Sequence, residues 1–118
     1  MKVRLFKTRG FTAAANKALI SDSSLRQAFS EMLLGQADDL GGGIWKKRLN
    51  ANRHRSIVLA RGRRYWVYQF LFAKQDQGNI SLKELMAFRE LARVYDRLDD
   101  WQVQQMLEMN AFVEIKHD

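Results

Sequence analysis

Three consecutive runs of β-branched and aromatic residues, between residues 44 and 73, constrain the fold more than any other feature. The runs are IWKKRLN, SIVLA and YWVYQFLFA, and short turns at Asn50–Asn52 and Arg61–Arg63 separate them. Val, Ile, Tyr, Phe and Trp favour strands, and connections this short join antiparallel neighbours. The sequence therefore predicts an antiparallel meander. Its last run, Tyr65–Ala73, is apolar on both faces and is expected to be the central strand.

Helical patterns precede and follow this meander. VRLFKT alternates like a short strand, FTAAANKALI is Ala-rich, and LRQAFSEMLLGQA repeats apolar residues at helical spacing after a run of N-cap residues. After the meander, LKELMAFRELARVYDRL is amphipathic, and Ser81 with Glu84 has capping-box spacing. We expect an α+β fold in which a small antiparallel β-sheet of three or four strands combines with N-terminal helices and a C-terminal helix. One face of this sheet is expected to carry the helices and the other to be open.

The length of the chain favours a single domain, because 118 residues can enclose one core but not two. We divide the domain, residues 1–118, into a basic β-meander at 39–74, an amphipathic helix at 81–98 and a C-terminal extension at 99–118. The chain has no Cys, which favours a reducing compartment. No apolar run reaches the roughly 18 residues of a membrane helix, and MKVRLFKTRGF lacks the apolar region of a secretory signal. We therefore expect a cytoplasmic protein without a membrane partner.

The positive charge of the chain is concentrated in the meander. The chain has 20 Lys and Arg residues and 13 acidic residues, which gives a formal net charge of +7. Nine of the 20 lie between Asp39 and Asp76, where no acidic residue occurs, so the 13 acids nearly balance the other 11. Clustered charge of one sign indicates a polyanionic partner, such as nucleic acid, an acidic membrane surface or an acidic protein. The alternative is a surface that merely keeps the protein soluble.

Strand periodicity assigns the charged and aromatic side chains of the meander to faces. Because side chains alternate along a strand, Lys46 and Arg48 share one face of the first run, and Arg53 and Arg55 share one face of the second. On the last run one face is predicted to carry Trp66, Tyr68, Phe70, Phe72 and Lys74. A sheet face with Lys46, Arg48, Arg55 and Lys74 beside one or two rings could bind phosphates and stack bases, although most of the rings are expected in the core.

Three segments of the sequence together resemble the RelE-like toxins of bacterial type II toxin–antitoxin systems, and in particular their HigB-like branch. The segments are DLGGGIWKKRL, HRSIVLARGRRYWVYQFLFAKQDQGNIS and LKELMAFRELA. They carry an Asp-Leu-Gly-Gly-Gly element, a Lys-x-Arg strand and a strand that ends in Phe-Ala-Lys. The resemblance covers about residues 6–98. The chain departs from the branch in its shorter loop at Asn50–Arg53 and in His54, which stands where Tyr is usual.

The resemblance implies a RelE-like microbial RNase fold and a toxin that cleaves mRNA at the ribosome, with an antitoxin, often a helix-turn-helix DNA-binding protein, as its partner. No cofactor is implied. Metal-independent cleavage needs a base for the 2′-hydroxyl, charge stabilisation at the phosphate and an acid for the leaving oxygen. We expect Arg55 to hold the scissile phosphate, Lys46, Arg48 and Lys74 to stabilise charge, and His54 to move protons. Either Lys could also serve as base or acid. The expected RNA-binding residues are Lys47, Arg53, Arg61, Arg63 and Arg64.

Other functions remain compatible with the same residues. Some relatives with this fold inhibit DNA gyrase and cleave no RNA, and a noncatalytic RNA-binding module would also need a basic surface. His54 could equally be an ordinary surface residue, and each of the five RNA-binding candidates could lie on a solvated face. No metal site is expected, because the two His residues lie 63 positions apart and the carboxylates show no ligand spacing.

Overall fold

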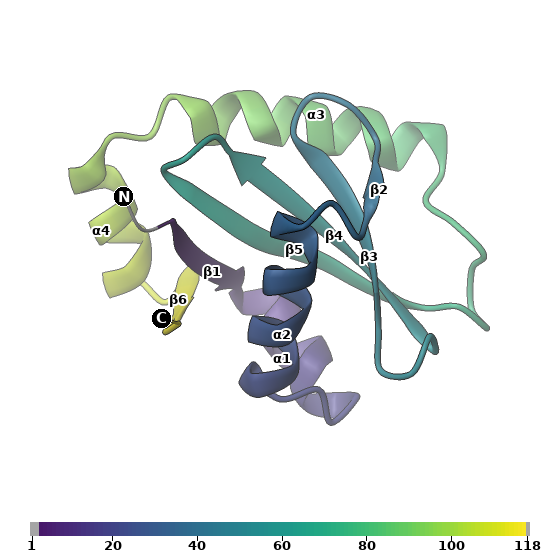
Figure 1. Cartoon of the computed structure of the whole chain (residues 1–118). Helices are drawn as coiled ribbons and strands as arrows, with labels where there is room; N and C mark the ends of the chain where they lie inside the picture. The colour runs from purple at the N-terminus through teal and green to yellow at the C-terminus, as the bar shows by residue number, and fades with distance from the viewer. Residues whose placement is uncertain (1–2, 118) are drawn as a thin grey trace.

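The computed structural model describes residues 3–117 (Figure 1). Within this range the chain forms six strands and four helices. The strands are β1 (Arg4–Thr8), β2 (Asp38–Asp39), β3 (Ile44–Leu49), β4 (His54–Arg61), β5 (Tyr65–Ala73) and β6 (Phe112–Ile115). The helices are α1 (Arg9–Lys17), α2 (Asp22–Leu33), α3 (Leu82–Asp96) and α4 (Asp100–Glu108). None of these helices is long and apolar enough to cross a membrane.

The six strands form one mixed sheet in the order β2-β3-β4-β5-β1-β6. The predicted meander is confirmed, because β3, β4 and β5 pair antiparallel and β5 lies inside the sheet. The prediction of a purely antiparallel sheet of three or four strands is wrong: β1 pairs parallel to β5, and β2 and β6 extend the sheet at its two edges. These two added strands are too short for alternation to reveal them. A parallel β1–β5 pair is possible because a long connection, with helices, separates the two strands.

Helices cover both faces of the sheet, so the prediction of one open face is wrong. One core lies between the sheet and the pair α1 and α2, and it includes Phe11, Phe29 and Tyr68. The other lies between the sheet and the pair α3 and α4, and it includes Phe6 and Ile57. Figure 1 shows α3 crossing one end of the meander, while the β3–β4 turn extends away from it. On the α3 face, the end of the meander near that turn carries the exposed residues Arg48 and Lys74 beside the buried Arg55 and Phe72.

A β-bulge at Gln69 changes which side chains of β5 share a face. Ile57 of β4 pairs with Phe70, and the next residue, Val58, pairs with Tyr68, which leaves Gln69 as the extra residue. A bulge shifts the alternation by one position. Tyr68 accordingly belongs to the core under α1 and α2, whereas Phe70 packs with the core under α3. The predicted single face with Trp66, Tyr68, Phe70, Phe72 and Lys74 is therefore wrong, since the first two lie opposite the last three.

The three tyrosines of the chain are buried in these cores, which leads to a prediction for high pH. Tyr65 Oη donates a 2.5 Å hydrogen bond to the carbonyl of Tyr95, and Tyr68 Oη donates one of 2.7 Å to the carbonyl of Leu25. Desolvation raises the pKa of Tyr65 to about 12, and it also raises the pKa of Tyr68 and of Tyr95. The unfolded chain therefore loses its phenolic protons at a lower pH than the folded protein does. The free energy of unfolding should consequently fall as the pH rises from about 10 through 12.

A near-ultraviolet titration of phenolate absorbance checks this prediction. We expect little ionisation at about pH 10 and a rise that coincides with unfolding, followed in parallel by circular dichroism. Phenolate that forms at about pH 10 in the folded protein would contradict the burial of these rings.

Candidate nucleic-acid interface

The end of the meander near the β3–β4 turn gathers five cations, Lys46, Arg48, Arg53, Arg55 and Lys74, which we call the basic end. Arg48 of β3 lies directly opposite Arg55 of β4, and Arg55 in turn lies opposite Phe72 of β5. Lys74 follows two positions after Phe72. Like charges placed opposite one another destabilise a sheet. The pairing of Arg48 with Arg55 thus indicates a surface shaped for an anion rather than for stability alone.

The nine cations of the meander fall into two groups, according to whether they pair with an acidic residue. Four of them have an acidic partner: Lys46, Lys47, Arg61 and Arg64. Five have none within residues 3–117: Arg48, Arg53, Arg55, Arg63 and Lys74. Four of these five belong to the basic end. Positive charge without an acidic partner is therefore concentrated at the basic end.

Arg55 is the most unusual of these cations, because it is buried without a carboxylate. Its side chain lies on the same face as Phe72, and the residue is 6% exposed. Nη1 donates hydrogen bonds of 2.9 Å to the carbonyl of Asn52 and 3.2 Å to that of His54. Nε and Nη2 make no hydrogen bond to another described residue. Because a buried charge is costly without a counter-ion, an anion that reaches this guanidinium would bind favourably.

Lys46 and Lys74 border the same face at different depths. Lys46 Nζ donates to Asn79 Oδ1 at 3.3 Å and lies 3.6 Å from Asp38 Oδ2, so the loop before α3 and strand β2 both hold it. Lys74 is exposed, and its backbone N–H donates to the carbonyl of Arg53 at 2.9 Å. The ammonium group of Lys46 is thus held in place by two contacts, whereas that of Lys74 is free to change position when a ligand binds.

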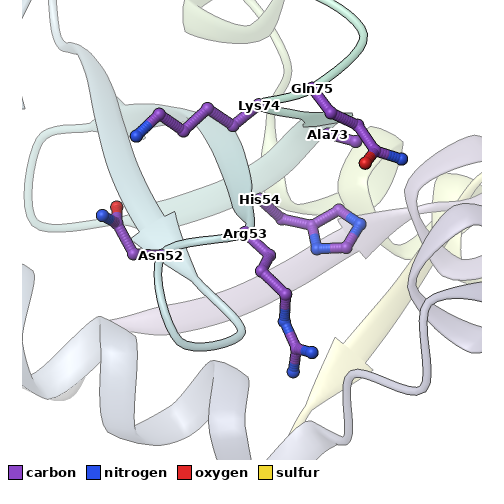
Figure 2. A pocket seen from close by; sticks show the side chains of 6 residues that line it. All are labelled: Asn52, Arg53, His54, Ala73, Lys74 and Gln75. Atoms are coloured by element: carbon purple, nitrogen blue, oxygen red, sulfur yellow. The ribbon is translucent and has the colours of Figure 1, made fainter.

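His54 lies on the other face of β4 from Arg55. It lines an open pocket of ≈ 530 Å³ at the end of the strands, together with Asn52, Arg53, Ala73, Lys74 and Gln75. Figure 2 shows that Lys74 extends away from the His54 ring, whereas Arg53 extends on the side of that ring. The side chains of His54 and Arg55 therefore lie on opposite faces of β4 in this structure. A ligand that wraps around the end of β4 could still contact both.

Two of the predicted RNA-binding residues are engaged inside the protein. Lys47 Nζ donates to the carbonyl of Gln36 at 2.9 Å and pairs with Glu31 Oε1 at 2.9 Å. The hydrogen bond from Lys47 to Glu31 lowers the pKa of the Glu31 carboxyl. Arg61 Nη1 bonds Asp96 Oδ1 at 2.9 Å, and Nη2 bonds the carbonyl of Gly42 at 2.6 Å. Both side chains are buried. These contacts give each side chain a structural role.

Arg63 and Arg64 lie far from the basic end. They follow β4 at its other end, on the order of 25 Å from Arg55 at roughly 3.3 Å per strand residue. Arg64 Nη2 donates to the carbonyl of Leu98 at 2.7 Å, so it also joins the β4–β5 turn to the segment after α3. The single basic patch predicted from the sequence is thus two separate groups.

The asparagines of the β3–β4 turn are polar residues beside the basic end, and their sequence pattern predicts only a turn. Asn50, Ala51 and Asn52 all have positive φ, at 54°, 53° and 70°. Asn tolerates this left-handed backbone better than most residues, and the Asn-x-Asn pattern was the available signal. Gln75, which lines the pocket, and Asn79, which bonds Lys46, carry no comparable signal in the sequence. Among residues 3–117, no group of three His, Asp or Glu side chains is placed to hold a metal ion.

A family model described as RelE toxin of RelE / RelB toxin-antitoxin system matches residues 3–115. This range includes all six strands, all four helices and the whole basic end. Searches of curated proteins and of solved structures found no significant match.

Proposed function

Since the chain belongs to the RelE family of toxins from toxin–antitoxin systems, we propose that it is an endoribonuclease that cleaves mRNA at the ribosome and thereby inhibits translation. The observation that carries this proposal is Arg55, a buried guanidinium with no acidic partner in residues 3–117, opposite a second unpaired arginine. A site that needs an anion to balance its charge suits the phosphate backbone of RNA.

The proposed reaction is the transfer of a phosphodiester to its own 2′-oxygen. A base removes the proton of the 2′-hydroxyl, the 2′-oxygen bonds to phosphorus, and the bond to the 5′-oxygen breaks as that oxygen takes up a proton. The pentacovalent phosphate carries one more negative charge than the substrate. Cations fixed before the reaction stabilise that extra charge without reorganising.

We assign Arg55 and Arg48 to the scissile phosphate, because they lie opposite one another on adjacent strands, with Arg48 exposed and Arg55 buried beside it. Lys46 and Lys74 flank this pair and supply further charge or a transferable proton. Arg53 would contact the backbone of an adjacent nucleotide. Its guanidinium bonds the carbonyl and side chain of Asn50 at 3.2 Å in both cases, which leaves Nη1 free of described partners.

The partner in the cell would be an antitoxin, as the family description states for the RelE/RelB system. We propose further that the chain belongs to the HigB-like branch and that its antitoxin is a cytoplasmic helix-turn-helix protein. The Asp-Leu-Gly-Gly-Gly element and the Phe-Ala-Lys strand end support this assignment.

The test is a purified translation system with a defined mRNA, read by primer extension. We expect wild-type protein to produce cuts at defined codon positions, and the Arg48→Ala/Arg55→Ala double variant to produce none. The same mRNA without ribosomes shows whether cleavage depends on translation. Intact mRNA with normal translation would contradict the proposal. A DNA gyrase supercoiling assay would then test the non-nuclease alternative.

A further inference from the structure

Asn50 occupies the centre of a small hydrogen-bond network at the β3–β4 turn. Its backbone carbonyl accepts from Arg53 Nε at 3.2 Å, and its side-chain Oδ1 accepts from Arg53 Nη2 at 3.2 Å. On its other side, Asn50 Nδ2 lies 3.2 Å from His54 Nδ1. One amide side chain thus joins the guanidinium of Arg53 to the ring of His54.

The direction of both side-chain hydrogen bonds follows from what each group can donate. A guanidinium has N–H donors and no acceptor, so the Asn50 atom that faces Arg53 must be the oxygen. The amide is planar and carries its NH₂ group on the opposite arm, which therefore faces His54. An NH₂ group can only donate. His54 Nδ1 must accept, and an accepting ring nitrogen carries no proton.

The neutral ring of His54 consequently carries its proton on Nε2. The ring lines the pocket at the end of the strands, and Nε2 makes no hydrogen bond to another residue in the described part of the chain. An N–H donor is therefore open to whatever enters that pocket. The free Nη1 group of Arg53 and the side chain of Gln75 border the same space.

We propose that Asn50 is a positioning residue, which fixes the His54 ring with its proton on Nε2 so that the pocket presents this N–H group to an acceptor oxygen or nitrogen of bound RNA. This role rests on the proposed function. Because His54 faces away from Arg55, the acceptor belongs to the nucleotide next to the scissile phosphate and not to that phosphate itself. The network makes the pocket selective for hydrogen-bond acceptors.

The backbone of the turn restricts the residue that can fill this role. Asn50 has a φ of 54°, and among residues with a side chain Asn and Asp adopt this conformation most readily. Asp would keep the bonds to Arg53 but would offer His54 an acceptor in place of a donor. Asn50→Asp is therefore expected to keep the turn and to force a proton onto His54 Nδ1.

Nitrogen-15 NMR of the histidine ring tests the inference without RNA. In the wild-type protein, we expect the neutral ring of His54 to show Nδ1 in the unprotonated range and Nε2 in the protonated range. In Asn50→Asp, Nδ1 should move to the protonated range. Asn52→Asp is the matched control: it makes the same change in the same turn, at a φ of 70°, and no hydrogen bond joins the Asn52 side chain to the ring. Its spectrum should resemble that of the wild type.

Cleavage in the translation system tests the consequence for RNA. Asn50→Asp should cleave roughly ten-fold more slowly than Asn52→Asp, as expected when one N–H donor to the substrate is lost. A protonated Nδ1 in the wild type, or an unchanged ring in Asn50→Asp, would overturn the inference, and equal cleavage by the two variants would overturn the role in RNA binding. Absence of cleavage by the wild type would instead remove the proposed function, while the spectra still decide the state of the ring.

Discussion

Replacing Arg55 by Met is expected to slow RNA cleavage strongly without lowering the stability of the fold. Met keeps much of the length of the side chain and removes a buried charge that faces Arg48 and has no acidic partner in residues 3–117. We expect cleavage to fall by about 10²–10³-fold, as when one donor to a developing oxyanion is removed. The free energy of unfolding should change by less than about 1 kcal/mol, because relief of charge repulsion offsets the two lost hydrogen bonds to backbone carbonyls.

Arg61→Met is the matched comparison, since Arg61 is an arginine of the same strand with a similar burial. Its guanidinium bonds Asp96 and the carbonyls of Gly42 and Ala92, at distances of 2.9, 2.6 and 3.2 Å. Loss of these bonds should lower the free energy of unfolding by about 2–4 kcal/mol. Chemical denaturation monitored by circular dichroism measures both variants. The free energy of unfolding should thus stay nearly unchanged when the functional arginine, Arg55, is replaced, and should fall when the structural arginine, Arg61, is replaced.

Arg55→Lys extends this test to the geometry of the site. Lys keeps the positive charge but cannot grip two phosphate oxygens at once. Cleavage by Arg55→Lys should therefore stay well below that of the wild type. Full activity of Arg55→Lys would show that charge alone is sufficient. A loss of stability in Arg55→Met as large as that in Arg61→Met would show that Arg55 is a structural residue. The assignment of the scissile phosphate to Arg55 would then be contradicted.

The sequence predicted the local structure of the meander and of α3 well, because both depend on nearby residues. Alternation and turn residues marked β3, β4 and β5, and the capping box of Ser81 and Glu84 is present at the start of α3. The bulge at Gln69 was not predictable in this way. Tyr65–Ala73 is apolar on both faces, so a shift of one position leaves its hydrophobic pattern unchanged.

The roles of individual cations depend on partners that are distant in the sequence. Lys47 and Arg48 are neighbours and look alike, yet Lys47 pairs with Glu31 of α2 whereas Arg48 is exposed on the other face. Arg61 bonds Asp96, which lies 35 positions later on α3. Composition could therefore suggest an anionic partner for the meander, but it could not indicate which of its nine cations bond other groups of the protein.

The triple glycine before β3 shows how the same distant contacts fix a motif. Gly41, Gly42 and Gly43 all have positive φ, and Asp39 Oδ1 accepts from the backbone N–H of Gly41 at 2.9 Å. The carbonyl of Gly43 accepts from the N–H of Ala60 at 2.7 Å. The motif thus joins β2, β3 and the Arg61 end of β4, and it lies at the opposite end of β3 from the basic end.

Gly43→Ala should be strongly destabilising, and Gly42→Ala should be much less so. A Cβ on Gly43 would lie 2.5 Å from the carbonyl oxygen of Ala60 and would also clash with Nη2 of Arg61, at a φ of +77°. A Cβ on Gly42, at a φ of +64°, would meet nothing within 4 Å. Both variants bear left-handed strain of about 1–2 kcal/mol, and overpacking adds about 1–3 kcal/mol at Gly43 alone. Denaturant titrations should therefore separate the two variants by about 2 kcal/mol.

A double-mutant cycle with Arg61→Met identifies which contact causes the loss. Arg61 can rotate away, but the carbonyl of Ala60 is part of the β4 backbone and cannot move without breaking its strand pairing. If the backbone contact dominates, Gly43→Ala should cost nearly as much in the Arg61→Met background as in the wild type. If the guanidinium dominates, most of the cost should disappear in that background. Equal stability of Gly42→Ala and Gly43→Ala would contradict the close approach of β3 to β4 at this glycine.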